Sequence, residues 1–329
     1  MQSEADIVES LIRSAGRRVE PPEDAYGHVY TVAHEAFRKK TSKHRERMWI
    51  LWAAAAAVLV FAIALMARWT PPVAQQEELA RIARAAGEVE VATGDIWRPL
   101  AEARARLTPG IKIRTQADGR VALTLTGGES LRLAGGTEVM LDAPGRLYVP
   151  GGTIYVDSGA RPSGSHLEVV TAVATARDVG TQFEVAVTGG ALRLRVREGL
   201  VALDHGGESF RGQAGEQIAI DGKGGISRAS IAPHDAAWQW AEAIAPMPDM
   251  DGKPAADLIS WVARETGRKL TYESPLVEQR ASAVILHGDI RNFSPMAALE
   301  AMLATTDLAV ELNGDTMEIR ARSTAPTGP

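Results

Sequence analysis

The chain of 329 residues carries a formal net charge of -5 and contains no cysteine. This length allows two or three folded units, and the slightly acidic balance gives no reason to expect nucleic-acid binding. The absence of cysteine excludes disulfides, thiolate catalysis and cysteine-bound zinc.

Residues 1–47 contain two short stretches with apolar residues at helical spacing, which predict a helical segment. The first stretch includes Leu11 and Ile12, and the second includes Tyr30 and Phe37. Helices this short bury little surface by themselves. We therefore predict that these four residues contact a partner protein. The alternative is a stalk beside the membrane that binds nothing.

An uncharged apolar segment begins at Met48 and ends at Ala67. About 20 such residues form a helix long enough to cross ~30 Å of hydrocarbon, so we predict one transmembrane helix over residues 48–67. Lys and Arg are frequent in the ten residues before this segment, whereas the ten residues after it contain only Arg68. Positive charge stays on the cytoplasmic side. This predicts an inner (plasma) membrane protein with a cytoplasmic N-terminus and periplasmic C-terminal domains. A cleaved signal peptide fits poorly, because 47 residues precede the segment.

Residues 68–87 are predicted to form a linker, in which residues 77–86 have the composition of a short helix. Residues 88–226 then form short runs that alternate apolar and polar side chains, separated by glycine pairs. A period of two predicts strands, and glycine pairs predict tight turns. We expect an all-β domain, either a sandwich or a coiled solenoid of short strands. No glycine-rich phosphate-binding pattern leads into a helix, so no cofactor is expected. No metal is expected either, because the spacing of His28, His34 and His44 does not place them on one helix face.

The rest of the chain predicts a connector over residues 227–243, a small α+β unit over residues 244–320 and a disordered tail over residues 321–329. The elements expected in the α+β unit are a helix between Pro254 and Gly267, strands at 270–272 and 283–286, a second helix from Ser294, and a hairpin from Val310 to Ile319 that turns at Asn313 and Gly314.

Three segments in the β region resemble the FecR family of membrane-bound sigma-factor regulators. They are DVGTQF at residues 178–183, VREGLV at residues 196–201 and AGEQI at residues 214–218. The final α+β unit is similar to the short N-terminal domain (STN domain) of secretins and TonB-dependent receptors. The resemblance implies cell-surface signalling: a periplasmic signal from a TonB-dependent outer-membrane receptor controls an extracytoplasmic-function sigma factor in the cytoplasm, and thereby transcription.

The resemblance also implies two sites. Some FecR-like regulators break spontaneously at a Gly-Thr bond, which here is Gly180-Thr181. The alternative, which general considerations favour, is a glycine at the start of a strand and a β-branched threonine packed in the sheet. The closing hairpin, with Val310, Leu312 and Ile319, is expected to dock the receptor's signalling domain by strand addition. Its alternative is a cap on the β domain.

A periplasmic scaffold that binds cell-envelope components, without contact to a sigma factor, is the alternative to the regulator. An enzyme is not expected, because Asp142, Asp157, Asp178 and His166 match no catalytic arrangement.

Overall fold

The computed structural model describes residues 4–16, 22, 27, 29–35, 77–102, 106–159, 166–178, 180–290 and 293–322. The chain separates into two units, Met1–Gln75 and Gln76–Pro329. No helix among the described residues is both long and apolar enough to cross a bilayer. The predicted span at 48–67 and Phe37 lie outside the described residues.

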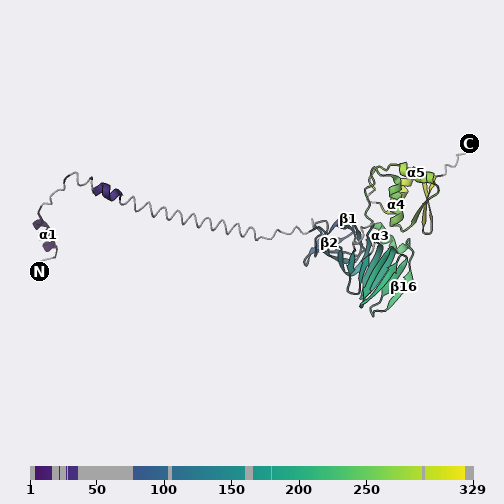
Figure 1. The fold of residues 1–329 in the computed structure, drawn as a ribbon, viewed down its shortest axis with the longest axis horizontal. Helices are drawn as coiled ribbons and strands as arrows, with labels where there is room; N and C mark the ends of the chain where they lie inside the picture. Colours follow the sequence, from purple (N-terminus) through teal and green to yellow (C-terminus); the bar gives the residue numbers. More distant parts are fainter. Residues whose placement is uncertain are drawn as a thin grey trace. The chain divides into compact units, whose positions relative to one another are not determined.

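The described part of the first unit is helical. Helix α1 (Glu4–Ser14) has an ion pair on its surface between Arg13 and Glu9, 3.1 Å apart. Residues 29–35 form a second helical stretch (Figure 1). Both stretches carry exposed apolar side chains: Val8, Leu11 and Ile12 on the first, and Val29, Tyr30 and Val32 on the second.

The second unit is mostly β-structure, and its strands β1 to β16 form two sheets that share one long strand, β8 (Arg146–Asp157). The strand order of the first sheet is β1 (Ala80–Ala86), β5 (Arg120–Leu125), β6 (Ser130–Leu133), β8, β11 (Gln182–Thr188), β12 (Ala191–Glu198), β15 (Glu216–Ile220) and β16 (Ile226–Ser230). The order of the second is β3 (Ile96–Pro99), β2 (Val89–Thr93), β4 (Lys112–Thr115), β7 (Glu138–Ala143), β8, β9 (Glu168–Val170), β10 (Thr175–Asp178), β13 (Leu200–His205) and β14 (Glu208–Gln213). Neighbouring strands are antiparallel except β8 and β9.

Strand β8 passes from one sheet to the other at Gly152. Before this glycine β8 pairs with β7 and β9, and after it with β6 and β11. Gly152 has a φ of +100°, and a Cβ there would lie 2.3 Å from the Cα of Thr137. Only glycine satisfies both the backbone angle and this close approach.

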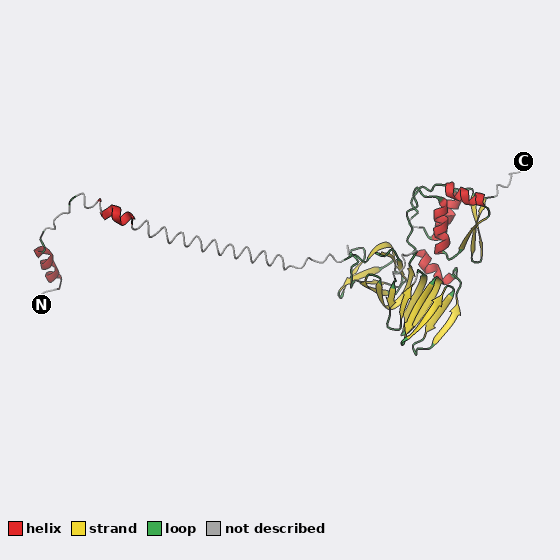
Figure 2. Ribbon diagram, in the orientation of Figure 1, coloured by secondary structure: helices red, strands yellow, loops and turns green. Residues whose placement is uncertain are grey.

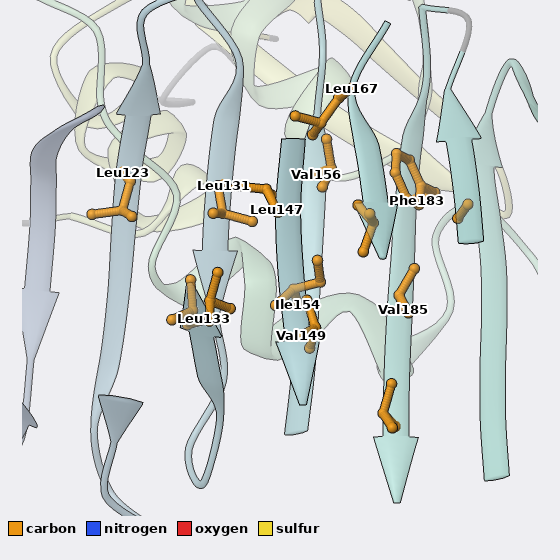
Figure 3. Close-up of a cluster of buried hydrophobic side chains, with 14 of the residues drawn as sticks. Leu123, Leu131, Leu133, Leu147, Val149, Ile154, Val156, Leu167, Phe183 and Val185 are labelled. Atoms are coloured by element: carbon orange, nitrogen blue, oxygen red, sulfur yellow. The ribbon is translucent and has the colours of Figure 1, made fainter. Parts of the chain in front are cut away.

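The two sheets enclose one apolar core, which Figure 3 shows in part. Along β12, Leu192, Leu194 and Val196 are buried in this core, and the arginines between them point to the opposite face of the sheet. The period-two pattern thus correctly predicted an all-β domain. Of the two architectures left open, the structure has the sandwich of two sheets.

The short helix expected at residues 77–86 was wrong. This segment contains strand β1, which pairs with β5 from Ala80 opposite Leu125 to Ala86 opposite Arg120. Alanine and arginine favour helices, but Leu79 and Ala80 are buried in the sandwich core. Backbone pairing with β5 and this burial outweigh the weak intrinsic preference.

The connector and the small α+β unit follow β16, and Figure 2 shows their helices in red. The connector holds a short 3-10 helix (Ala236–Trp238) and α3 (Gln239–Ala243). The remaining elements are α4 (Ala255–Glu265), β17 (Lys269–Tyr272), α5 (Pro275–Ala283), α6 (Pro295–Ala304), β18 (Leu308–Asn313) and β19 (Thr316–Ala321). The sheet order is β17-β19-β18, with β17 parallel to β19. We call residues 254–322 the module.

The predicted elements of the module are confirmed except for one strand and one turn. Residues 283–286 form no strand: Ile285 makes an isolated bridge with Pro254, and helix α5 occupies the segment before it. Ser274 followed by Pro275 is a pattern typical of a helix start, and it would have predicted α5 at this position. The hairpin turns at residues 314–315, because Asn313 pairs with Thr316.

Candidate functional site

The three FecR-like segments meet in space around Gly199. This residue has a φ of +83°, and a Cβ there would lie 2.7 Å from the Gly180 carbonyl oxygen and 2.6 Å from Cγ2 of Thr181. Its own carbonyl accepts a hydrogen bond from the Ala214 N–H at 3.1 Å. Glycine at 199 therefore lets the second segment lie directly against the first, with the third beside it.

Thr181 is held from both sides of its backbone. Its side chain is buried, with 1% of the residue exposed. The Thr181 N–H donates to Ser158 Oγ at 2.6 Å, and the Thr181 carbonyl accepts from the Ser158 N–H at 3.0 Å and from its hydroxyl at 2.9 Å. Gly180, by contrast, is exposed and has a φ of +68°. The bond between them joins an exposed, left-handed glycine to a fixed, buried threonine.

A buried carboxylate lies beside the Thr181 hydroxyl. Asp178 Oδ1 accepts from the Leu167 N–H at 2.6 Å, and Asp178 Oδ2 is 3.5 Å from Thr181 Oγ1. In a self-cleavage reaction the hydroxyl oxygen would bond to the Gly180 carbonyl carbon and pass its proton to Asp178. The carbon–nitrogen bond would then break as the nitrogen takes up a proton, and water would hydrolyse the resulting ester. Asp178 is placed to act as the base.

The next residue, Gln182, connects this site to the module. Gln182 Nε2 donates to Asp157 Oδ2 at 2.9 Å, and Arg264 of helix α4 donates to Asp157 Oδ1 at 2.6 Å and to Glu198 Oε2 at 2.9 Å. Burial alone would raise the pKa of Asp157, but Arg264, Gln182 and the Gly159 N–H hold this pKa below its ordinary value. A lowered pKa means that the pairing stabilises the fold at neutral pH and is lost as the pH falls through the folded-state pKa.

The outer face of the first sheet carries a second cluster, which the sequence analysis missed. Arg132 is fully buried and forms a bidentate pair with Glu265 of α4, with both nitrogen–oxygen distances 2.8 Å. Its guanidinium also lies over the ring of Tyr155, 4.9 Å from the centroid. Burial raises the pKa of Tyr155 to about 12. The alternation of leucine and arginine in the sequence could have predicted this cluster, because it places the arginines together on one face of the sheet.

The predicted partner-binding residues lie in different surroundings. Leu11, Ile12 and Tyr30 are 61%, 71% and 71% exposed. On the edge strand β18, Val310 is partly buried and Leu312 is 42% exposed. Ile319 lies on the central strand β19 and is fully buried in the module core. Of the three hairpin residues, only Val310 and Leu312 therefore lie on the free edge of this sheet.

The four residues weighed for catalysis do not form one site. Asp142 pairs with Arg146 at 3.0 Å on the surface, and His166 lines a cavity of about 380 Å³ at one end of the sandwich. Asp157 and Asp178 flank the Gly180-Thr181 site as described. Within the described ranges, no group of three or more histidine or acidic side chains could hold a metal ion.

Comparison with protein-family models agrees with the predicted family resemblance. Residues 111–202 match the family model described as FecR protein, so the β domain contains a FecR-like segment and that prediction is confirmed. No curated protein matches the chain.

Two crystal structures of a protein described as a "putative anti-sigma factor" from Parabacteroides distasonis ATCC 8503, at 1.65 and 2.50 Å resolution, are similar to the chain at 18% and 19% identity. Each match covers 64% of this chain and 99% of the other, with a TM-score of 0.36.

The Gly180-Thr181 geometry yields a first prediction. Self-cleavage gives two fragments, one ending at Gly180 and one beginning at Thr181, and intact mass spectrometry of the purified chain measures them. Thr181→Ala removes the attacking oxygen and leaves one full-length species, whereas Thr181→Ser keeps the oxygen and restores cleavage. Asp178→Asn keeps an acceptor for the Leu167 N–H and slows the reaction. A single full-length species from the unaltered chain would contradict this prediction.

Proposed function

We propose that the chain is a single-pass inner-membrane regulator that relays a periplasmic signal to an extracytoplasmic-function sigma factor. The observation that carries the proposal is the FecR family match over residues 111–202, within the two-sheet domain. The predicted membrane span and the exposed apolar side chains of the first unit support it, since they supply a route across the bilayer and a surface for a cytoplasmic partner.

The cytoplasmic contact is assigned to helix α1. This helix has 11 residues, and isolated helices of that length are marginally stable in water. Its exposed Val8, Leu11 and Ile12 form a stripe at helical spacing, the pattern with which an amphipathic helix binds in a partner's groove. A partner that covers the stripe stabilises the helix and gains apolar burial in the same step.

The periplasmic contact is assigned to the module. Among the strands that the structure describes, β18 pairs with β19 alone, so its other side offers backbone groups for strand addition. Val310 and Leu312 lie on this strand. We propose that the signalling domain of a TonB-dependent outer-membrane receptor docks here.

The topology leads to a second prediction. A reporter that is active only in the periplasm, fused after Pro329, should be active, and the same reporter fused before Met1 should be inactive. The basic residues before the span hold the N-terminus in the cytoplasm. The opposite pattern of activities would reverse the orientation.

The third prediction concerns the α1 stripe. The double variant Leu11→Asp and Ile12→Asp should weaken sigma-factor binding at least ~10-fold, because unpaired charges would be buried in the interface. Co-purification and titration with the cognate sigma factor measure the loss.

A double variant on the same helix, Glu9→Ala and Arg13→Ala, is the matched control, because it removes an exposed ion pair of little expected energy. Unchanged binding by the stripe variant would remove these residues from the interface.

The fourth prediction separates docking from capping. Deletion of residues 247–329 should leave the two-sheet domain folded, because its apolar core contains no residue of the deleted part. The cell should nevertheless fail to respond to the inducer. Circular dichroism of the truncated chain and a sigma-dependent reporter measure the two effects. Loss of the β-sheet signal would instead favour the cap.

A further inference from the structure

The module and the two-sheet domain have separate apolar cores. The core of the sandwich, the core of the module and a small cluster of Tyr155, Trp238 and Ala241 share no residue. Ion pairs and hydrogen bonds connect the module to the rest: Glu265 with Arg132, Arg264 with Asp157 and Glu198, the Glu265 carbonyl with Arg197, and the Phe293 carbonyl with Arg84. The junction between the two folded parts is thus rich in charge.

The Arg132–Glu265 pair lies at the centre of this junction. The side chain of Arg132 is 0% exposed and that of Glu265 is 4% exposed. Arg132 Nη1 also donates to the Ala241 carbonyl at 3.0 Å, and Arg132 Nε donates to Ser130 Oγ at 3.2 Å. Removing one partner of such a pair leaves an unpaired charge in the closed junction. Separating the two parts instead exposes Glu265 to water, whereas Arg132 keeps its Ala241 and Ser130 partners and is hydrated on the side that Glu265 leaves.

The connector belongs to the two-sheet domain. Trp238 is fully buried against Tyr155, with ring centroids 6.0 Å apart. Arg197 donates to the Pro233 carbonyl at 2.6 Å and to Glu242 Oε1 at 2.6 Å, and Trp240 Nε1 donates to Glu184 Oε2 at 2.9 Å. These contacts hold the connector to the sheet up to α3. Residues 246–249, which form neither helix nor strand and precede Met250 of the module core, are the first segment beyond it that can act as a hinge.

We propose that the module is a detachable cover, closed over the outer face of the first sheet by the Arg132–Glu265 pair and opened about residues 246–249. Opening moves Glu265 and Arg264 away together and leaves Arg132 and Asp157 without these partners, while the connector keeps Tyr155 covered. A partner that binds only the released module, or only the uncovered face, shifts the equilibrium from the closed to the open state. The size of the shift is set by the difference in its affinity for these two states. The proposal rests on the junction alone and holds whichever partner the module binds.

The experiment uses single-molecule fluorescence transfer on the full-length chain in detergent. Because the chain has no cysteine, the conservative changes Ser209→Cys on β14 and Ser282→Cys on α5, both at exposed positions, place one label on each part. The unaltered junction should give one dominant closed population. Arg132→Met or Glu265→Met alone should raise the open population at least tenfold, because each leaves a buried charge unpaired.

The double variant Arg132→Met with Glu265→Met is the decisive arm. Two apolar side chains of similar length replace a buried ion pair with little loss, so closure should return to within about twofold of the unaltered chain. Arg228→Met, which breaks the half-exposed pair with Glu216 on the same sheet, is the matched control and should change nothing.

A second variant is expected to open the junction without changing any charged residue. A Cβ at Gly267 would lie 2.1 Å from the Pro233 carbonyl oxygen and 2.5 Å from Arg197 Nε, whereas Gly252 has a similar φ and open space around it. Gly267→Ala should therefore raise the open population and Gly252→Ala should not. Unchanged transfer in the single variants and in Gly267→Ala would overturn the proposal. So would loss of the β-sheet circular dichroism in Arg132→Met, since the pair would then belong to the fold of the domain.

Discussion

Strand β8 is the constraint on which the two-sheet domain depends. It is the strand through which the two sheets are continuous, and the change of sheet takes place at Gly152. A side chain at this position would collide with the backbone of Thr137. The two halves of β8 bring buried leucine, valine and isoleucine into a single core, so the crossing sets the separation of the sheets and the register of their neighbours.

The same crossing arranges the FecR-like segments. Beyond Gly152, β8 pairs with β11, which places Asp157 opposite Gln182, next to Thr181. Ser158, just after β8, then reaches the backbone of Thr181. Segments separated along the chain are therefore neighbours in space because of one strand crossing, and Gly199 allows the closest of these contacts. The family match, which spans residues 111–202, includes the first two of these segments, and the third follows it at residues 214–218.

Local patterns in the sequence predicted several strands and helix starts correctly. Features that depend on contacts between residues distant in sequence were missed. Alternation along β12 predicted a strand with a buried face, and Ser294 correctly marked the start of α6, where its hydroxyl accepts from the Ala297 N–H at 3.3 Å. The segment from Ala80 to Ala86 looked helical because the partner that makes it a strand, β5, lies far along the chain. The contact between Arg132 and Glu265 joins residues 133 positions apart, so no local pattern could reveal it.

The two faces of the first sheet follow from the same alternation but have different physical consequences. On the inner face each buried leucine contributes about 1.5–3 kcal/mol, a gain that is lost whenever the sheets separate. On the outer face, loss of one partner of a buried ion pair costs roughly 3–5 kcal/mol, but only while the other partner stays buried. An inner face of leucine and valine therefore makes the sandwich permanent. On the outer face, Arg132 and Asp157 instead meet Glu265 and Arg264 of the module, and charged side chains regain hydration when such a contact separates. A rigid sandwich and a releasable contact in one sheet are the two properties that the proposed signalling function requires.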